Sequence, residues 1–290
     1  MRFQQIKQAI WLEYPDLPIH TIEKIGEGSD SRAYCINEHI IFRFPKCEKI
    51  KRKLRKEMVV LPLIRNLLNI PVPDFQYVSI TAIFAGYPKL NGEFLWKERL
   101  NTFDIHTQDL IAEQMAHFLH SLHHINWQPL YKEWVEPLDL KQVYQEEYEN
   151  AKKRVFPLAT IPVRKLIHTA FDNYLSNPLN FIYTPALLHA DLSPDHILYD
   201  PLQQKLTGII DFGDMMVGDP AIDIMYLFHF WGEGFLRSFL HYYPHNNTEI
   251  LLSRIRFFRI AYQSDLLCHA IKHHSANEIK EYLDWFFEYK

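Results

Sequence analysis

The segment His189–Leu198 (His-Ala-Asp-Leu-Ser-Pro-Asp-His-Ile-Leu) limits the fold of this chain more than any other stretch. Short apolar runs bounded by turn residues lie on both sides of it, over 186–188 and 197–199, and such runs are typical of buried strands. A third run, over 206–210, ends at Asp211, where an Asp-Phe-Gly tripeptide begins. The chain is therefore predicted to place polar side chains at the ends of neighbouring buried strands.

Three of these side chains suit phosphoryl transfer. Asp191 can accept a proton, while His196 beside a second carboxylate, Asp211, can hold a divalent cation. Each residue type alone is ordinary in a loop, and Asp-Phe-Gly alone is a weak signal. The order is what carries information: His-x-Asp, a polar residue five positions beyond the Asp, and then a strand that ends in Asp-Phe-Gly.

This order resembles the catalytic and metal loops of the protein-kinase-like fold. The Ser-Pro-Asp-His sequence in the first loop is more specifically similar to the aminoglycoside phosphotransferases, above all to the 2″-phosphotransferase group. The resemblance covers most of the chain. It implies an α+β, two-lobed kinase-like fold, with a small, mainly β nucleotide-binding lobe in residues 1–90. The mainly helical lobe in residues 91–290 is then expected to carry the catalytic loops and the acceptor site.

The first lobe is predicted to begin with an amphipathic helix and to continue as a hairpin. Alternating residues indicate a strand over 19–25, a glycine-containing turn over 26–31, and further strands over 33–36 and 39–44. A helix is expected over 48–68. The resemblance implies that the turn lies over nucleotide phosphates, with the backbone of Gly28, Ser29 and Ser31 facing them.

The third strand of this lobe departs from the kinase-like pattern. The pattern has a lysine that reaches the phosphates, and Arg43 stands there, on the same strand face as Ile41. Arginine can clamp phosphate through two hydrogen bonds. Lys46 follows three residues later, so either cation is a candidate for the phosphates. The resemblance assigns the partner carboxylate to Glu57 on the following helix.

A hinge between the lobes is predicted where two further strands, over 75–80 and 81–87, give way to Pro88–Gly92. In the resembling family a purine bonds the backbone here, which corresponds to Lys89 and Leu90. Tyr87 precedes them, and a large aromatic residue at this place goes with use of GTP. The donor is therefore expected to be GTP or ATP, with GTP favoured.

The rest of the chain reads as helical. Apolar residues recur at helical spacing over 104–124, 138–154 and 163–175, and a helix over 221–231 is separated from an aromatic helical tail by a Gly-Glu-Gly break. The resemblance implies that Asp191 is the catalytic base, that His196 and Asp211 hold Mg²⁺, and that His189 braces the loop. An aminoglycoside is a polycation, so acidic residues are the candidates to hold it. These are Asp191, Asp214, Glu233 and Asp265.

Composition limits the other possibilities. The formal net charge of −4 argues against a nucleic-acid-binding protein, and the basic run over 49–56 is interpreted as the solvated face of a helix. The three cysteines are far apart and suggest neither a metal site nor a disulfide framework. No apolar run approaches the roughly 20 residues of a membrane span, and residues 1–12 do not resemble a signal peptide. A cytoplasmic monomer is expected.

Two alternatives stay open at this point. A kinase of the same fold acting on a macrolide, choline, a sugar or a homoserine-like metabolite would share these motifs, since macrolide kinases also carry a His five residues after the catalytic Asp. A non-catalytic nucleotide-binding module is favoured by Arg43 in place of lysine, whereas the intact Asp191, His196 and Asp211 speak against it. A protein kinase is disfavoured because no Ala-Pro-Glu segment follows Asp214.

Overall fold

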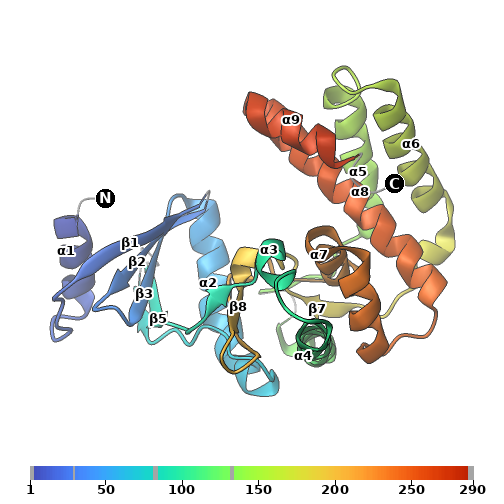
Figure 1. Ribbon diagram of the computed structural model, residues 1–290. Helices are drawn as coiled ribbons and strands as arrows, with labels where there is room; N and C mark the ends of the chain where they lie inside the picture. Colours follow the sequence, from blue (N-terminus) through green and yellow to red (C-terminus); the bar gives the residue numbers. More distant parts are fainter. Residues whose placement is uncertain (1–2, 29, 81–83, 131–133, 287–290) are drawn as a thin grey trace.

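A computed structural model describes residues 3–28, 30–80, 84–130 and 134–286. A sheet-containing lobe and a larger helical lobe lie side by side, and the chain passes between them near the middle of the molecule (Figure 1). This arrangement agrees with the expected two-lobed α+β architecture.

The small lobe is built on an antiparallel sheet with the strand order β1-β2-β3-β5-β4. Its strands are β1 (Ile22–Glu27), β2 (Ser31–Ile36), β3 (Ile40–Pro45), β4 (Tyr77–Val78) and β5 (Ala85–Pro88). The predicted strands over 75–80 and 81–87 are therefore shorter than expected, and residues 81–83 lie outside the described part. Asn37 and Glu38, between β2 and β3, both have positive φ, 51° and 68°, as a tight hairpin turn requires.

Two helices accompany this sheet. Helix α1 (Phe3–Glu13) buries Ile6 and Ile10 in a cluster with aromatic residues of the sheet. Helix α2 (Glu48–Ile64) buries Leu54, Leu61 and Glu57. The helix predicted over 48–68 continues beyond α2 only as a 3₁₀ turn, Arg65–Leu67. The apolar face of α2 joins the core cluster that extends into the large lobe.

The large lobe is mainly helical. Its helices are α3 (Lys97–Leu100), α4 (Ile105–His123), α5 (Leu140–Arg154), α6 (Ile161–Ser176), α7 (Ala221–Tyr242), α8 (Thr248–Lys272) and α9 (Ala276–Trp285). The break predicted after Trp231 is present as a kink inside α7, where Gly232 has φ 84° and ψ −174°. Only glycine adopts this backbone conformation at low cost. Helices α5, α6, α8 and α9 gather at the end of the lobe away from the sheet (Figure 1).

Two small sheets carry the loops of the large lobe. One has the strand order β6-β8-β9, formed by Glu93–Phe94, Ile197–Asp200 and Lys205–Ile209, and the other pairs β7 (Ala186–Leu188) with β10 (Met216–Gly218). The three buried strands expected around the polar loops are thus confirmed. Among the described residues, no helix has the length and apolar character needed to cross a membrane.

Candidate active site

The loop between β7 and β8 is fixed by the side chain of His189, which is fully buried. Its Nδ1 accepts from the amide of Asp191 at 3.2 Å, and its Nε2 lies 3.0 Å from the carbonyl oxygen of Ile210. A carbonyl oxygen only accepts, so Nε2 carries the proton and the ring is neutral. Burial lowers the pKa of His189 to about 4, in agreement with this form. The geometry fits the bracing role expected for His189.

Ala190 has a positive φ of 64°, which costs free energy for a residue with a Cβ. Asp223 of α7 accepts hydrogen bonds from the amides of His189 and Ala190, at 2.9 and 2.7 Å. The Tyr226 hydroxyl donates to the carbonyl oxygen of Ala190 at 2.8 Å. Asp223 is held in turn by His123 of α4, whose Nε2 lies 3.1 Å from it. Helix α7 therefore holds the loop in a strained conformation.

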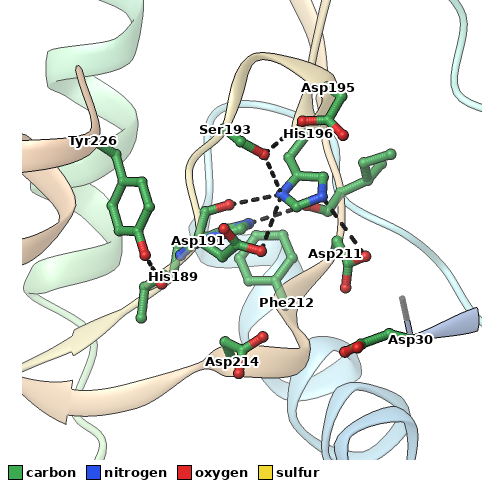
Figure 2. Close-up of polar contacts among 12 residues, drawn as sticks. Asp30, His189, Asp191, Ser193, Asp195, His196, Asp211, Phe212, Asp214 and Tyr226 are labelled. Carbon is green, nitrogen blue, oxygen red and sulfur yellow. Dashed lines mark hydrogen bonds and ion pairs between the residues drawn. The ribbon is translucent and has the colours of Figure 1, made fainter. Parts of the chain in front are cut away.

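Asp191 and His196 face each other across the same loop (Figure 2). His196 Nδ1 lies 2.7 Å from the carbonyl oxygen of Asp191 and 3.6 Å from its carboxylate Oδ2. Burial raises the pKa of Asp191 to about 6, with the charge of His196 opposing it and those of Asp214 and Asp211 adding to it. A carboxylate with such a pKa is a better proton acceptor than an ordinary one.

Asp211 follows β9 in a left-handed conformation, φ 64° and ψ 63°, which turns its carboxylate toward His196. His196 Nε2 lies 3.8 Å from Asp211 Oδ2. Burial would raise the pKa of Asp211, but the charges of Arg43 and His196 outweigh burial, and the pKa lies below the usual value. Asp211 is therefore ionised at neutral pH, with one carboxylate oxygen directed at a histidine nitrogen.

Arg43, on β3, connects the two lobes. Its Nη1 donates to both carboxylate oxygens of Glu57, at 2.9 and 2.8 Å, and its Nη2 donates to Asp211 Oδ1 at 2.9 Å. Burial disfavours the charged guanidinium, but Glu57 and Asp211 hold the pKa of Arg43 above its usual value. Glu57 is buried and also accepts from the amide of Phe212 at 3.2 Å.

Lys46, the other candidate cation, has different partners. Its Nζ donates to the carbonyl oxygen of Gly28 at 2.6 Å and lies 3.3 Å from Glu27. The structure therefore places Arg43, and not Lys46, in the ion pair with Glu57. The turn between β1 and β2 leaves open space at Gly28, where no atom lies within 4 Å of an added Cβ. Ser29 lies outside the described residues.

Ser31 at the end of this turn has a buried hydroxyl oxygen without a hydrogen-bond partner among the described residues. Buried polar atoms are rarely left unsatisfied, so this one points to a ligand or an ordered water. Together with the open space at Gly28, it suits a site for phosphate oxygens.

The hinge is held to both lobes. Lys89 donates from its amide to the carbonyl oxygen of His39 at 2.8 Å. Ile41 and Tyr87 are cross-strand partners in β3 and β5, and both are buried. The side chain of Leu90 covers Gly208 so closely that a Cβ there would lie 2.8 Å from it. The predicted purine-contacting segment is therefore fixed in place, with the bulk of Tyr87 directly before it.

The positions of Asp211 and His196 suit a cation that is bound by the phosphates of the nucleotide as well as by the protein. No group of three or more His, Cys, Asp or Glu side chains in the described part of the chain is arranged to hold a metal ion. Because Nδ1 of His196 points at a carbonyl oxygen, its Nε2 is left to face Asp211. Mg²⁺ is commonly held by one or two protein ligands together with phosphates and waters. The Asp211–His196 pair fits that binding mode.

The predicted acceptor residues are not gathered in one place. Asp214 pairs with Lys53 at 2.8 Å, and its charge raises the pKa of Asp191. Glu233, after the kink in α7, pairs with the exposed Arg237 on its own helix. Within the described part of the chain, the polar contact of Glu233 is with Arg237 and not with the catalytic loop, and its role stays a prediction.

Asp265 lies on α8, on the side of the helix that Tyr262 shares. The Tyr262 ring lies 5.2 Å from the ring of Tyr226, whose hydroxyl donates to the carbonyl oxygen of Ala190 at 2.8 Å, so Tyr262 lies next to the catalytic loop. Burial raises the pKa of Glu147, on α5, to about 8, with the charge of Asp265 adding to it. The charge of Asp265 therefore disfavours ionisation of Glu147 on the adjacent helix, and a bound cation would relieve this repulsion.

Several residues of the site have no signal in the sequence. Lys53 belongs to a run interpreted as a solvated helix face, yet it contacts Asp30 and Asp214. Tyr226, Tyr262 and Glu147 lie in ordinary amphipathic helices. Their spacing indicates a helix and not which of its residues meets the catalytic loop.

Comparison with known proteins gives one family. A description of the phosphotransferase enzyme family matches residues 21–258. The solved GDP and kanamycin complex of APH(2″)-IIIa superposes with a TM-score of 0.92, at 30% identity, over 98% of this chain and 97% of that one. A macrolide 2′-phosphotransferase of type I, at 17% identity and a TM-score of 0.75, covers 98% of this chain and 97% of its own, and shares the fold.

A curated relative carries no assigned activity. The uncharacterized protein YcbJ of Bacillus subtilis (strain 168) is 23% identical over 218 residues, which is 70% of this chain and 67% of that protein. The fold expected from the loops is confirmed by these matches, and the site residues described above lie inside the matched range 21–258, apart from Tyr262 and Asp265.

Proposed function

The chain belongs to the phosphotransferase enzyme family, and on this basis we propose that it transfers the γ-phosphate of GTP or ATP to a hydroxyl group of an aminoglycoside antibiotic, in the 2″ manner, and so confers resistance. The observation that carries the proposal is the meeting of Asp191, His196 and Asp211 at the ends of neighbouring strands, with Arg43 beside them. The similarity to the kanamycin complex of APH(2″)-IIIa supports the choice of acceptor.

Asp191 is the proposed catalytic base. Its carboxylate orients the acceptor hydroxyl and takes its proton as the phosphoryl group is transferred. The raised pKa of about 6 suits this step, because the carboxylate is still ionised at neutral pH and holds a proton more firmly than an exposed Asp. His189, Ala190 and Asp223 keep the carboxylate in place.

Asp211 and His196 are the proposed ligands of Mg²⁺, which when bound neutralises charge on the triphosphate. Arg43 is proposed to hold the phosphates, with Glu57 fixing its guanidinium plane. The turn residues Gly28, Ser29 and Ser31 are proposed to cover the phosphates from the other side.

The purine is proposed to bond the backbone near Lys89 and Leu90. We favour GTP over ATP, because the buried Tyr87 fills the space directly before that segment. The GDP bound in the APH(2″)-IIIa complex supports this preference.

The acceptor is proposed to lie between the catalytic loop and α8. Asp265 offers negative charge to an ammonium group of an aminoglycoside, and Glu147 beside it, whose pKa of about 8 leaves it mostly protonated in the free protein, becomes a second anion when an ammonium group approaches. The rings of Tyr226 and Tyr262, 5.2 Å apart, line this region next to the catalytic loop. Asp214 and Glu233 are proposed as further acceptor contacts, and each also pairs with a cation of the chain, Lys53 and Arg237.

We further propose that residues 1–90 act as the nucleotide-binding lobe and residues 91–290 as the acceptor-binding lobe. The working unit is proposed to be a monomer. The cytoplasm, which supplies GTP and ATP, is the proposed location.

The test is transfer of labelled γ-phosphate from GTP and from ATP to kanamycin, gentamicin, a macrolide and choline, with the Asp191→Asn variant as control. Transfer to kanamycin or gentamicin that falls by about 10²- to 10⁴-fold in the variant is expected. Transfer to the macrolide or to choline alone would show that the acceptor is not an aminoglycoside. A folded wild-type protein that transfers phosphate to none of them would contradict the proposal.

A further inference from the structure

One lysine of α2 joins three segments of the site. Lys53 Nζ lies 3.0 Å from Asp30 Oδ2, in the turn between β1 and β2, and 2.8 Å from Asp214 Oδ2, just after the Asp-Phe-Gly tripeptide. The Lys53 side chain is 22% exposed. Burial disfavours its charge, but the two carboxylates outweigh burial and raise the pKa of Lys53. The ammonium group is therefore a permanent positive charge between this turn and the segment Asp211–Asp214, called the metal loop below.

The turn itself is held at two points. Lys46 donates from Nζ to the carbonyl oxygen of Gly28 at 2.6 Å and from its amide to the carbonyl oxygen of Asp30 at 3.0 Å. Lys53 then holds the side chain of Asp30. The turn is thus fixed on one side to β3 and on the other to α2, which sets its distance from the phosphate site.

The charges around that site explain why this contact matters. The Asp30 carboxylate is directed toward Asp214 (Figure 2), and Lys53 Nζ lies within hydrogen-bond distance of both. A nucleoside triphosphate is repelled by carboxylates at short range. Arg43 is already engaged by Glu57 and Asp211. Lys53 is the cation that the structure places on both Asp30 and Asp214.

We propose that Lys53 is a positioning residue for the phosphate donor: it holds the turn over the phosphates and offsets one of the two negative charges that Asp30 and Asp214 place beside them. This inference rests on the proposed function, since it concerns the same nucleotide site. Lys53 acts through the two carboxylates and does not itself touch the reacting atoms. Its loss is expected to weaken nucleotide binding far more than it slows the chemical step.

The experiment measures the affinity of the whole protein for GDP with Mg²⁺ by calorimetry, without an acceptor, and then KM and kcat. Lys53→Met is expected to raise the Kd for GDP and the KM for GTP roughly five- to tenfold, with kcat within about twofold. The matched control is Lys51→Met, two residues away on the same helix, where the lysine pairs with Glu48 of its own helix turn. This control is expected to bind GDP like the wild-type protein.

Two further variants separate charge balance from direct contact. Lys53→Arg, which keeps the charge, is expected to bind GDP nearly as well as the wild type. The double variant Lys53→Met with Asp30→Asn removes one of the two carboxylate charges and is expected to recover at least half of the lost affinity on a logarithmic scale. If Lys53→Met does not fold, as judged by circular dichroism, Lys53→Gln takes its place.

Each result decides the matter. Wild-type affinity in Lys53→Met overturns the inference alone, and so does a double variant without recovery, since Lys53 would then bind the phosphates itself. A fall in kcat that exceeds the rise in KM also overturns it. A wild-type protein that binds no nucleotide overturns the proposed function and, with it, this inference.

Discussion

Arg43 donates through a single nitrogen, Nη1, to both carboxylate oxygens of Glu57. The pair is buried, and removing one partner leaves the other charge without compensation. Arg43→Met is therefore expected to lower the free energy of unfolding by about 3–5 kcal/mol in urea denaturation. The double variant with Glu57→Met is expected to be less destabilised than Arg43→Met alone. Equal stability of the two variants would show that the buried carboxylate is not the source of the cost.

Asp223 is expected to control the shape of the catalytic loop. Asp223→Ala leaves the buried amides of His189 and Ala190 without their acceptor, at a cost of about 1–3 kcal/mol each. We expect faster hydrogen exchange at these amides and a large loss of kcat. Asp223→Asn keeps one acceptor oxygen and should fall between the wild type and Asp223→Ala. Unchanged exchange in Asp223→Ala would contradict the bracing role.

Gly92 is expected to tolerate no side chain. Its φ is 130°, and a Cβ there would lie 2.5 Å from Thr207 Oγ1 and 3.1 Å from the backbone of Tyr199. Gly92→Ala is expected to lower the free energy of unfolding by about 1–3 kcal/mol. Gly234→Ala is the matched control, because no atom lies within 4 Å of an added Cβ in that helical position. There we expect no loss, or a gain of about 0.5–1 kcal/mol. Similar losses in the two variants would point to a general intolerance of alanine.

Glu147 is expected to make stability depend on pH. Its pKa is raised from 4.5 to about 8, so the folded protein keeps the proton over a range in which the unfolded chain has lost it. The stability that this proton contributes is fully present below pH 4.5 and is lost as pH rises through about 8. Without acceptor, Glu147→Gln should therefore unfold at a higher temperature than the wild type at pH 9, by about 2 °C or more.

The same comparison at pH 4.5 is expected to give nearly equal unfolding temperatures. Glu146→Gln, on the exposed face of the same helix, serves as the control and should show no such change with pH. A constant difference between Glu147→Gln and the wild type from pH 4.5 to 9 would contradict the prediction.

The loops around Asp191 and Asp211 could be predicted from the sequence because their information is local. His196 and Asp211 are only 15 positions apart, and the short apolar strands and turn residues around them indicate that the chain folds back between the two. The chain breaks at Gly92 and Gly232 could also be predicted from local sequence, because glycine is common where the backbone adopts a conformation that other residues avoid.

The polar contacts between distant segments could not be predicted in this way. Lys53 pairs with Asp214 across 161 residues, and Asp223 accepts from the amide of Ala190 across 33. In the sequence, Lys53 is one of several basic residues on a helix, and nothing in the helical period separates it from Lys51. The choice between Arg43 and Lys46 also required the fold, because the position of Glu57 relative to β3 depends on how α2 packs.

Helix α2 has a consequence for the order in which the protein is completed during synthesis. The ribosome makes the small lobe first, yet Glu57 waits 155 residues for the amide of Phe212, and Arg43 waits 168 for Asp211. Until then Arg43 and Glu57 can pair with each other but lack these two later partners. The nascent small lobe therefore completes its native charge pairing only after the segment Asp211–Asp214 has left the exit tunnel, although its sheet can form earlier.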